Sequence, residues 1–283
     1  MPSFRSPEKQ ALKILKKRAM HGQKKEKGRR GENDGIHSIG TEKRYAQALT
    51  TFAKWRQEHG MTDGLNRATL EQAMQYLEQR AKTIGQKTLD ADRHALQKLL
   101  RTKIEPTRAK NKNNQLATKS RAYSDPQVEA ITKHQTPANA LATKVAYTCG
   151  LRAHELHTIQ RASNGKYTVT GKGGLTREIK MPKQLAQELE KRRLETPQKI
   201  KDRGINYTKH YDIGGGNSFS RSFTAASKRA LGFSHGAHGL RHSYAQNQLV
   251  RYQSEGMDWN KAREEVSREL GHFRPQITNK YLR

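Results

Sequence analysis

The chain has 283 residues, enough for two domains and at least one sizeable core. Its 55 Lys and Arg against 26 Asp and Glu give a formal net charge of +29, which favours a polyanionic partner, above all nucleic acid. No apolar run approaches the roughly 18 residues of a spanning helix, and the first residues do not resemble a signal peptide. We therefore expect a cytoplasmic protein with no membrane partner. The single cysteine, Cys149, excludes an intrachain disulfide and a cysteine cage for a metal ion.

Residues 1–37 form a basic N-terminal segment that we expect to be partly disordered. A short helix is predicted from Glu8 to Met20, followed by a charged run with glycines from Gly22 to Gly35. This run is either a solvated tail or an arm that lies along DNA phosphates. The candidate phosphate ligands in it are Lys24, Lys25, Arg29 and Arg30.

Residues 38–105 carry the spacing of a small helical bundle, which we interpret as a core-DNA-binding domain. The first helix begins near Thr41 and stops at Gly60, with apolar residues at helical spacing between them. Two more helices are predicted, from Arg67 to Lys82 with Asn66 as the cap, and from Thr88 to Thr102. Their exposed faces would carry cations that are either solvated or bound to phosphate. The candidates are Arg67, Arg93, Lys98 and Arg101.

Residues 106–122 are polar and basic without apolar periodicity, which predicts a linker between domains. The linker adds three candidate DNA ligands: Lys110, Lys112 and Arg121. A second domain, residues 123–283, then opens with the helix start Ser124-Asp125-Pro126.

The second domain is predicted to be mostly helical with one small sheet. Helices are expected at about 126–134, 138–148, 183–194, 218–231, 240–253 and 259–270. Residues 167–170 and 176–181 alternate around Gly171-Lys172-Gly173-Gly174, which is typical of a β-hairpin. The glycine-containing stretch 196–217 is expected to be a long loop. The fold class is therefore mainly α with a small antiparallel β-sheet (α+β).

Basic residues that suit phosphate chemistry lie near the C-terminus and, much earlier, at Arg152. Cleaving a phosphodiester without metal needs a nucleophile, cationic donors for the non-bridging oxygens, a base and an acid. Arginine suits the second role because its planar fork pairs with two oxygens, and Arg152 and Arg241 are the candidates. His238 lies three residues before Arg241, so a helix would project both to one side. His242 is expected to point elsewhere, as a buried partner.

Zinc is the rival use of the histidines, because His238 and His242 have the spacing of helical zinc ligands and His272 could join them. The acid of an HExxH motif is absent, and Arg241 between the two would repel a cation. No GxxxxGK[ST] phosphate loop and no GxSxG elbow is present. The sequence therefore predicts neither a metal nor a cofactor.

Five motifs in register resemble the tyrosine recombinase (phage integrase) family. They are Gly-Leu-Arg152-Ala-His-Glu155-Leu, the turn lysine Lys172, His238-Gly-Leu-Arg241-His, Leu-Gly-His272, and Tyr281 nine residues beyond. Each motif alone is weak, but their common order and spacing make chance agreement improbable. The resemblance covers about residues 123–281, and residues 38–105 are similar to the family's core-binding domain only by position and helix count.

The resemblance implies a role for each of these residues. Tyr281 would attack the scissile phosphate and form a 3′-phosphotyrosyl link, while Arg152 and Arg241 would brace the phosphorane. Lys172 would protonate the leaving 5′-oxygen, and His238 and His272 would bond phosphate oxygens or help to deprotonate the tyrosine. Glu155 would orient its neighbours. Neither metal nor ATP is implied, because the phosphotyrosine stores the bond energy.

Two departures from the family pattern accompany this resemblance. Gly239 stands where the family often has Asp, and only Leu282 and Arg283 follow Tyr281, where the family commonly has a helix that docks on a neighbour. The resemblance still implies a homo-oligomer, a dimer or tetramer, on double-stranded DNA.

The sequence therefore predicts a site-specific DNA recombinase or integrase of a mobile genetic element. A type IB topoisomerase-like nicking-closing enzyme would use the same chemistry, and a non-catalytic DNA-binding protein would keep only the charge. An RNA-binding protein is disfavoured because exposed aromatic RNP-like strands are missing.

Overall fold

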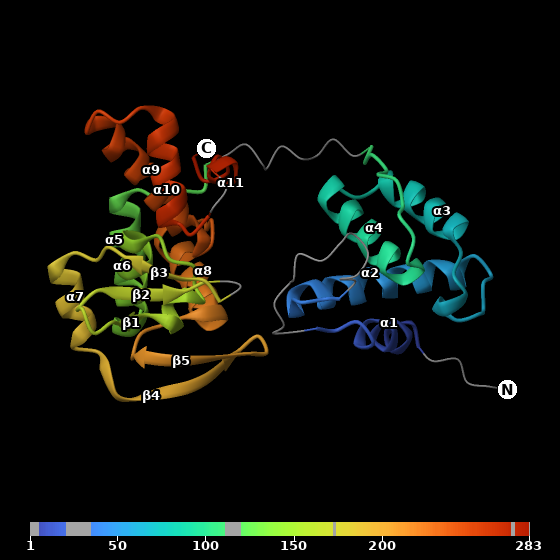
Figure 1. The fold of residues 1–283 in the computed structure, drawn as a ribbon, viewed down its shortest axis with the longest axis horizontal. Coiled ribbons are helices and arrows are strands. Elements are labelled where there is room, and N and C mark those ends of the chain that lie inside the picture. The colour runs from blue at the N-terminus through green and yellow to red at the C-terminus, as the bar shows by residue number, and fades with distance from the viewer. Residues whose placement is uncertain (1–5, 21–34, 111–119, 172–173, 273–274, 283) are drawn as a thin grey trace. The chain divides into compact units, whose positions relative to one another are not determined.

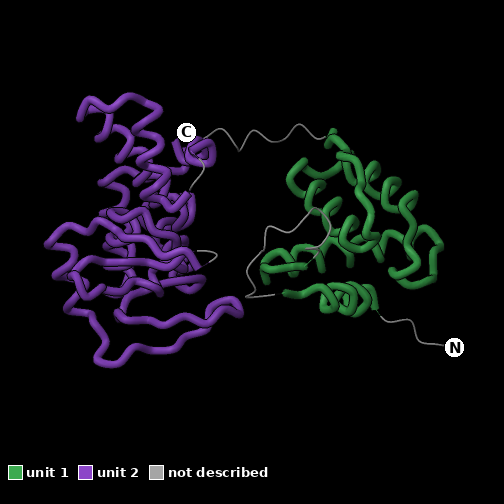
Figure 2. The backbone as a smooth tube through the Cα atoms, in the orientation of Figure 1, with its two compact units in different colours: residues 1–117 green, residues 118–283 purple. Residues whose placement is uncertain are grey.

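The computed structural model describes residues 6–20, 35–110, 120–171, 174–272 and 275–282. The chain divides into two compact units, residues 1–117 and 118–283, and each is considered by itself (Figures 1 and 2). Both are built mainly from helices, with small antiparallel sheets in the second unit, so the predicted fold class is confirmed. No helix in the described ranges is long and apolar enough to cross a membrane.

Unit 1 is a bundle of helices around one apolar core. Buried residues of the long second helix, such as Leu49 and Phe52, pack with Leu77 and Leu96 from the later helices. The elements are α1 (Pro7–Lys16), α2 (Ile39–Glu58), the 3-10 turn η1 (Leu65–Arg67), α3 (Leu70–Ala81) and α4 (Gln86–Leu100).

The start of α3 differs from the prediction. Thr69, not Asn66, is the N-cap, and it forms a capping box in which its hydroxyl accepts from the Gln72 amide and the Gln72 side chain bonds back. Asn66 lies in η1 instead, where the neighbouring Leu65 is buried. The helix starts later because Thr69 can satisfy the free amides of the first turn from both sides.

The chain beyond α4 stays packed on unit 1 as far as Lys110. Ile104 is buried in the core, the Lys110 amide donates to the Ala81 carbonyl at 2.8 Å, and the Gln86 side chain bonds the backbone of Thr107 and Ala109. The first part of the segment 106–122 therefore lies against this bundle.

Unit 2 contains a three-stranded antiparallel sheet that lies against helices (Figure 1). The strands β1 (Gln160–Arg161), β2 (Tyr167–Thr170) and β3 (Thr176–Ile179) lie in that order, with Val169 opposite Arg177. The hairpin predicted around 171–174 is therefore present. The helical elements are α5 (Asp125–Lys133), α6 (Pro137–Cys149), the 3-10 turn η3 (Glu155–Thr158), α7 (Lys183–Glu190), α8 (Gly216–Leu231), α9 (His238–Ser254), α10 (Trp259–Glu269) and α11 (Pro275–Thr278).

The prediction of a long loop at residues 196–217 is wrong. Most of this stretch belongs to a second antiparallel sheet formed by β4 (Arg193–Asp202) and β5 (Ile205–Tyr211), so the domain has two sheets rather than one. The Tyr207 ring lies 5.5 Å from the His157 ring of η3. The Asp202 carboxylate accepts from the Asn217 amide at 3.2 Å, in the first turn of α8. These contacts hold the hairpin on unit 2.

Candidate active site

Arg152 lies shortly after the end of α6. Gly150 ends this helix in the left-handed conformation (φ 63°), and a Cβ there would overlap the Tyr244 ring on α9. Glycine thus lets α6 approach α9 closely. Two residues on, Arg152 donates to Glu155 through Nη1 at 2.7 Å and through its backbone amide at 2.8 Å.

Arg241, in the first turn of α9, is fully buried. Its Nη1 donates to the Gly150 carbonyl at 2.5 Å, and its Nη2 donates to the Leu270 carbonyl. Each acceptor lies at the C-terminal end of a helix, where carbonyls lack intrahelical partners and the helix dipole favours a cation. Burial, and next the charge of Arg152, lower the pKa of Arg241 to about 10, so it remains a cation at neutral pH.

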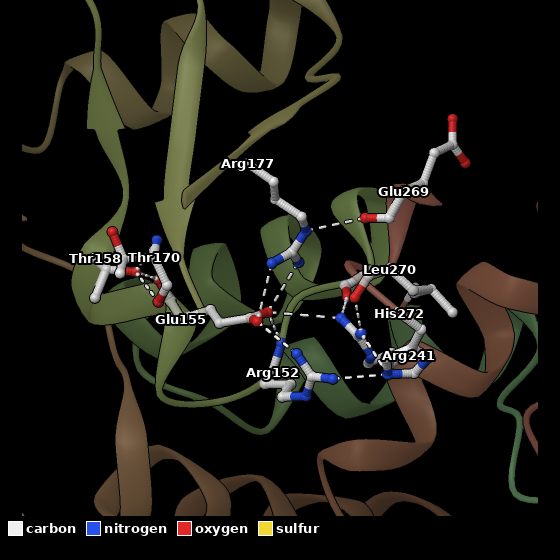
Figure 3. A network of polar contacts seen from close by, with 10 residues as sticks. Arg152, Glu155, Thr158, Thr170, Arg177, Arg241, Glu269, Leu270 and His272 are labelled. Atoms are coloured by element: carbon white, nitrogen blue, oxygen red, sulfur yellow. Dashed lines mark hydrogen bonds and ion pairs between the residues drawn. The ribbon is translucent and has the colours of Figure 1, made fainter. Parts of the chain in front are cut away.

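His272, just after α10, joins the two arginines (Figure 3). Its Nε2 lies 2.7 Å from Nη2 of Arg152 and 3.3 Å from Nη2 of Arg241. A guanidinium can only donate, so Nε2 must accept and the proton must sit on Nδ1. That Nδ1 is buried and has no hydrogen-bond partner among the described residues. Burial, followed by the charges of Arg241 and Arg152, lowers the pKa of His272 to about 4.

Tyr281 is docked on this cluster with 8% of its surface exposed. Its ring centroid lies 4.7 Å from that of His242, 5.3 Å from His272 and 5.5 Å from His238. The Arg241 guanidinium carbon lies 5.8 Å from the same centroid. The Tyr281 carbonyl accepts from the Gln246 side chain at 3.1 Å, which holds the backbone in place.

The expectation that His242 points away from His238 is wrong. The two rings are 5.5 Å apart and both face Tyr281, because residues four apart lie on one side of a helix. Burial, then the charge of Arg121, lowers the pKa of His242 to about 4. Desolvation by its neighbours and the charges of His242 and Arg241 also lower the pKa of His238, which keeps an exposed edge. The described residues contain no group of three or more His, Cys, Asp or Glu placed to hold a metal ion.

Glu155 is the buried counter-charge of the site. Besides Arg152, it accepts from Arg177 through both oxygens, each at 3.0 Å, and Nη1 of Arg241 lies 3.6 Å from its Oε2 (Figure 3). Burial alone would raise the pKa of Glu155, but the hydrogen bonds and charge of Arg177, with the charge of Arg241, lower it to about 2. The carboxylate is therefore ionised throughout the physiological range.

Arg177 was missed in the sequence analysis, although a signal was present. In a strand, residues two apart share a face, so Arg177 faces the same side of β3 as the buried Ile179. An arginine on the apolar face of a strand requires a buried acid, and Glu155 is that acid.

Lys172 lies outside the described residues. The preceding Gly171, the first residue after β2, is close to the site, because a Cβ there would lie 3.1 Å from Oε1 of Glu155. The chain that leads into the turn therefore begins beside the buried carboxylate.

Gly239 is required by the packing of α9 on the start of unit 2. A Cβ at this position would lie 2.5 Å from the Arg121 carbonyl oxygen and 2.5 Å from Cε2 of Tyr123. The Arg121 side chain in turn donates to the His235 carbonyl at 2.5 Å. The departure from the Asp common in the family thus has a steric reason in this chain.

The predicted DNA ligands fall into three groups. Arg67, Arg101, Lys110 and Arg121 are exposed, and Lys98 is half-buried. Arg93 is not on an exposed face, because its side chain is 15% exposed and donates to the Ile104 carbonyl at 3.0 Å. The others lie outside the described residues: Lys24, Lys25, Arg29, Arg30 and Lys112.

Solved recombinase structures share this fold over nearly the whole chain. An XerH site-specific recombinase in a post-cleavage complex with palindromic difH substrate matches with a TM-score of 0.61 and 14% identity, covering 99% of this chain and 94% of that one. A lambda integrase tetramer bound to a Holliday junction matches with a TM-score of 0.61 and 15% identity, covering 96% and 75%. A lambda integrase dimer bound to a COC′ core site matches with a TM-score of 0.57 and 17% identity, covering 88% and 73%.

The fold expected from the resemblance to tyrosine recombinases is therefore confirmed. At the sequence level, no protein-family profile and no curated protein matches the chain.

Proposed function

We propose that this protein is a site-specific DNA recombinase that cleaves and rejoins DNA through a 3′-phosphotyrosyl intermediate. One observation carries the proposal: the Tyr281 ring packs on three histidines beside Arg241, and Arg241 is linked to Arg152 through His272. A phenol, two guanidinium groups and neutral imidazoles supply the nucleophile, the cationic donors and the base that phosphodiester cleavage requires.

In the proposed reaction, the Tyr281 oxygen forms a bond to phosphorus as the bond from phosphorus to the 5′-oxygen breaks. The phenol proton passes to one of the neighbouring imidazoles, which are neutral at pH 7 because their pKa values are lowered. Arg152 and Arg241 neutralise the charge on the non-bridging oxygens. The leaving 5′-oxygen takes its proton from Lys172.

Strand exchange then reverses these steps with a different 5′-hydroxyl. Because the phosphotyrosyl bond retains the energy of the phosphodiester, the proposed reaction needs no ATP, and no step in it uses a metal ion. Glu155 stays ionised and orients the arginines rather than reacting.

The proposed substrate is double-stranded DNA, bound by a homo-oligomer in the cytoplasm. The net charge of +29 favours this partner, and the similar lambda integrase structures are a dimer and a tetramer on DNA. In this proposal residues 38–105 bind the core site, residues 106–122 link the domains, and residues 123–283 carry out the chemistry.

A nicked suicide duplex tests the reaction. Sites are first selected by the protein from random duplexes, then nicked near the cleavage point so that a short fragment is lost and the intermediate is trapped. We expect a covalent band on a denaturing gel that maps to Tyr281. Tyr281→Phe should bind the same DNA without forming the adduct, whereas Tyr147→Phe, whose hydroxyl bonds Asn247, should form it normally. An adduct that persists on Tyr281→Phe would overturn the proposal.

A second assay separates recombination from nicking-closing. Two duplexes with different end labels are incubated with the protein, and products that join one label to the other are measured. A recombinase yields such products, whereas a type IB topoisomerase-like enzyme only relaxes supercoiled DNA.

A further inference from the structure

We propose that Arg177 is a positioning residue that keeps one edge of Arg152 free for the scissile phosphate by occupying both oxygens of Glu155. The inference rests on the proposed function and adds a residue to the machinery that prepares the site. It follows from how the acceptor positions of one buried carboxylate are shared.

Each of the three nitrogens of Arg177 is already bonded within the protein. Its Nε donates to the Glu269 carbonyl at 3.0 Å, and its Nη1 and Nη2 each donate to a Glu155 oxygen at 3.0 Å. The side chain is 10% exposed. With each of its three nitrogens already bonded, Arg177 acts through its neighbours rather than on the substrate.

The Glu155 carboxylate offers about four acceptor positions, and all are used. Oε1 accepts Nη1 of Arg177 and Nη1 of Arg152. Oε2 accepts Nη2 of Arg177 and the Arg152 backbone amide. Arg152 therefore cannot form the two-bond fork that arginine usually makes with a carboxylate.

The consequence is visible at the other edge of Arg152 (Figure 3). Its Nη2 is left over and lies 2.7 Å from Nε2 of His272, on the side of the cluster where Tyr281 packs. If Arg177 were absent, both Glu155 oxygens would become available and Arg152 could close its fork on them. The Nη2 group would then be withdrawn from the site.

Arg177 also supports the turn that carries His272. Arg177 donates to the backbone carbonyl of Glu269, which is the last residue of α10. Gly271 packs on the Arg177 side chain, since a Cβ on that glycine would lie 3.2 Å from Cδ of Arg177. The Arg177 side chain thus connects the buried Glu155 carboxylate to the segment between α10 and His272.

The test measures single-turnover strand cleavage at saturating DNA. Arg177→Met should lower the cleavage rate on the order of 100-fold, as a misplaced catalytic group does, with little change in DNA affinity. Because the variant removes one partner of the buried Glu155 carboxylate, its melting temperature should also fall, and cleavage is measured at a temperature where it is fully folded. Lys180→Met is the matched control: it removes a cation three residues along that reaches the Glu269 side chain and makes no ion pair with Glu155 in the described structure. The control should cleave at the wild-type rate.

Two further variants guard against a folding defect and test the geometry. Arg177→Gln keeps one donor and most of the side-chain volume, so it should fold and still cleave slowly. Arg177→Lys keeps the charge but cannot bond two oxygens in one plane, and it should be impaired as well. Wild-type cleavage by Arg177→Lys would overturn the proposal.

A modified substrate separates loss of Arg152 placement from a general structural defect. A methylphosphonate at the scissile position replaces one charged non-bridging oxygen with a methyl group, so less charge needs a guanidinium. The ratio of wild-type to Arg177→Met rates should be at least tenfold smaller on this substrate than on phosphate. An equal ratio on both substrates would overturn the inference.

Failure of the proposed function and failure of this inference give different results. If the wild-type protein forms no adduct at all, the proposed function fails. If the wild-type protein forms the adduct and Arg177→Met cleaves equally fast, only this inference fails.

Discussion

Nη1 of Arg241 donates to the carbonyl of Gly150 at 2.5 Å, although the two residues are 91 positions apart in the chain. The bond joins the first turn of α9 to the last turn of α6, so one buried guanidinium fixes how the two helices meet. The same side chain reaches the Leu270 carbonyl at the end of α10.

Replacing Arg241 should therefore cost both stability and activity. Arg241→Met leaves two buried carbonyls and Glu155 without this cation, and we expect the free energy of unfolding to fall by about 3–5 kcal/mol. Arg241→Lys keeps the charge but loses the fork, so the cleavage rate should fall on the order of 100-fold. Urea unfolding and single-turnover cleavage measure the two effects. Full activity in Arg241→Lys would show that the fork is dispensable.

Glu155→Gln should expose the repulsion among the arginines that this carboxylate neutralises. Removing one partner from a buried ion pair costs about 3–5 kcal/mol of stability, and here three arginines lose their shared counter-charge. Glu129→Gln is the control, because that exposed residue pairs with Lys133 across one helical turn and its replacement should not change stability measurably. Chemical denaturation at pH 7 makes the comparison.

The same carboxylate should shape acid unfolding. Its pKa is lowered to about 2 in the fold, from 4.5, so its stabilising effect is present above pH 4.5 and is lost as the pH falls through 2. Denaturation midpoints from pH 5 down should decline less steeply in Glu155→Gln than in the wild-type protein. Equal slopes would contradict the pKa assignment.

Cleavage should persist in weak acid. Burial and the flanking arginines lower the pKa of His272 to about 4, so its Nε2 remains an acceptor well below the usual histidine pKa of 6.5. We expect the single-turnover rate to show no loss from His272 protonation between pH 7 and 5 and to fall as the pH approaches 4.

Stability has a different pH window from activity. The pKa of His242 and of His272 is about 4 in the folded protein and 6.5 in the unfolded chain, so between these values only the unfolded chain binds the protons. The contribution of the two histidines to stability therefore declines as the pH falls from 6.5 to about 4. Circular dichroism at each pH separates this decline from the rate. An acid limb in the rate near pH 6.5 on folded protein would contradict the His272 prediction.

Gly239→Ala tests the steric fit at the start of α9. The added Cβ would meet the Arg121 carbonyl and the Tyr123 ring at 2.5 Å, and we expect a loss of about 1–3 kcal/mol. Gly40→Ala is a control at the same position, the second residue of a helix, where the nearest atom is 3.7 Å away. There alanine should be neutral or stabilise by up to about 1 kcal/mol. Thermal melts of both variants compare them, and equal melting temperatures would show that the backbone relaxes.

Helices were predictable because their apolar spacing is a local property of the sequence. The helix expected from Thr41 to Gly60 spans Ile39–Glu58, and the one expected at 259–270 spans Trp259–Glu269. The β4–β5 hairpin was not predictable in this way. Most of its side chains are exposed, so its strands lack an apolar alternation, and its contacts with His157 and Asn217 join residues far apart in the chain.

The residues of the candidate site also fall into those that local sequence predicted and those that only tertiary contacts reveal. Spacing and motif order singled out Arg152, Arg241, His272 and Tyr281, and the structure places these side chains together, while their catalytic roles stay predictions. Arg177 lies on a strand and meets Glu155 only through tertiary packing. No linear motif indicates this contact, so the signal in the sequence was the position of Arg177 on the apolar face of the strand.

The docking of Tyr281 on His238, His242 and His272 of its own chain has a consequence for assemblies on DNA. In the proposed reaction, a subunit arranged in this way would cut in cis: the protomer that binds a phosphate would also supply the phenol that attacks it. Mixing Tyr281→Phe with Arg241→Met protomers should therefore restore no cleavage, because neither mutant can complement the other.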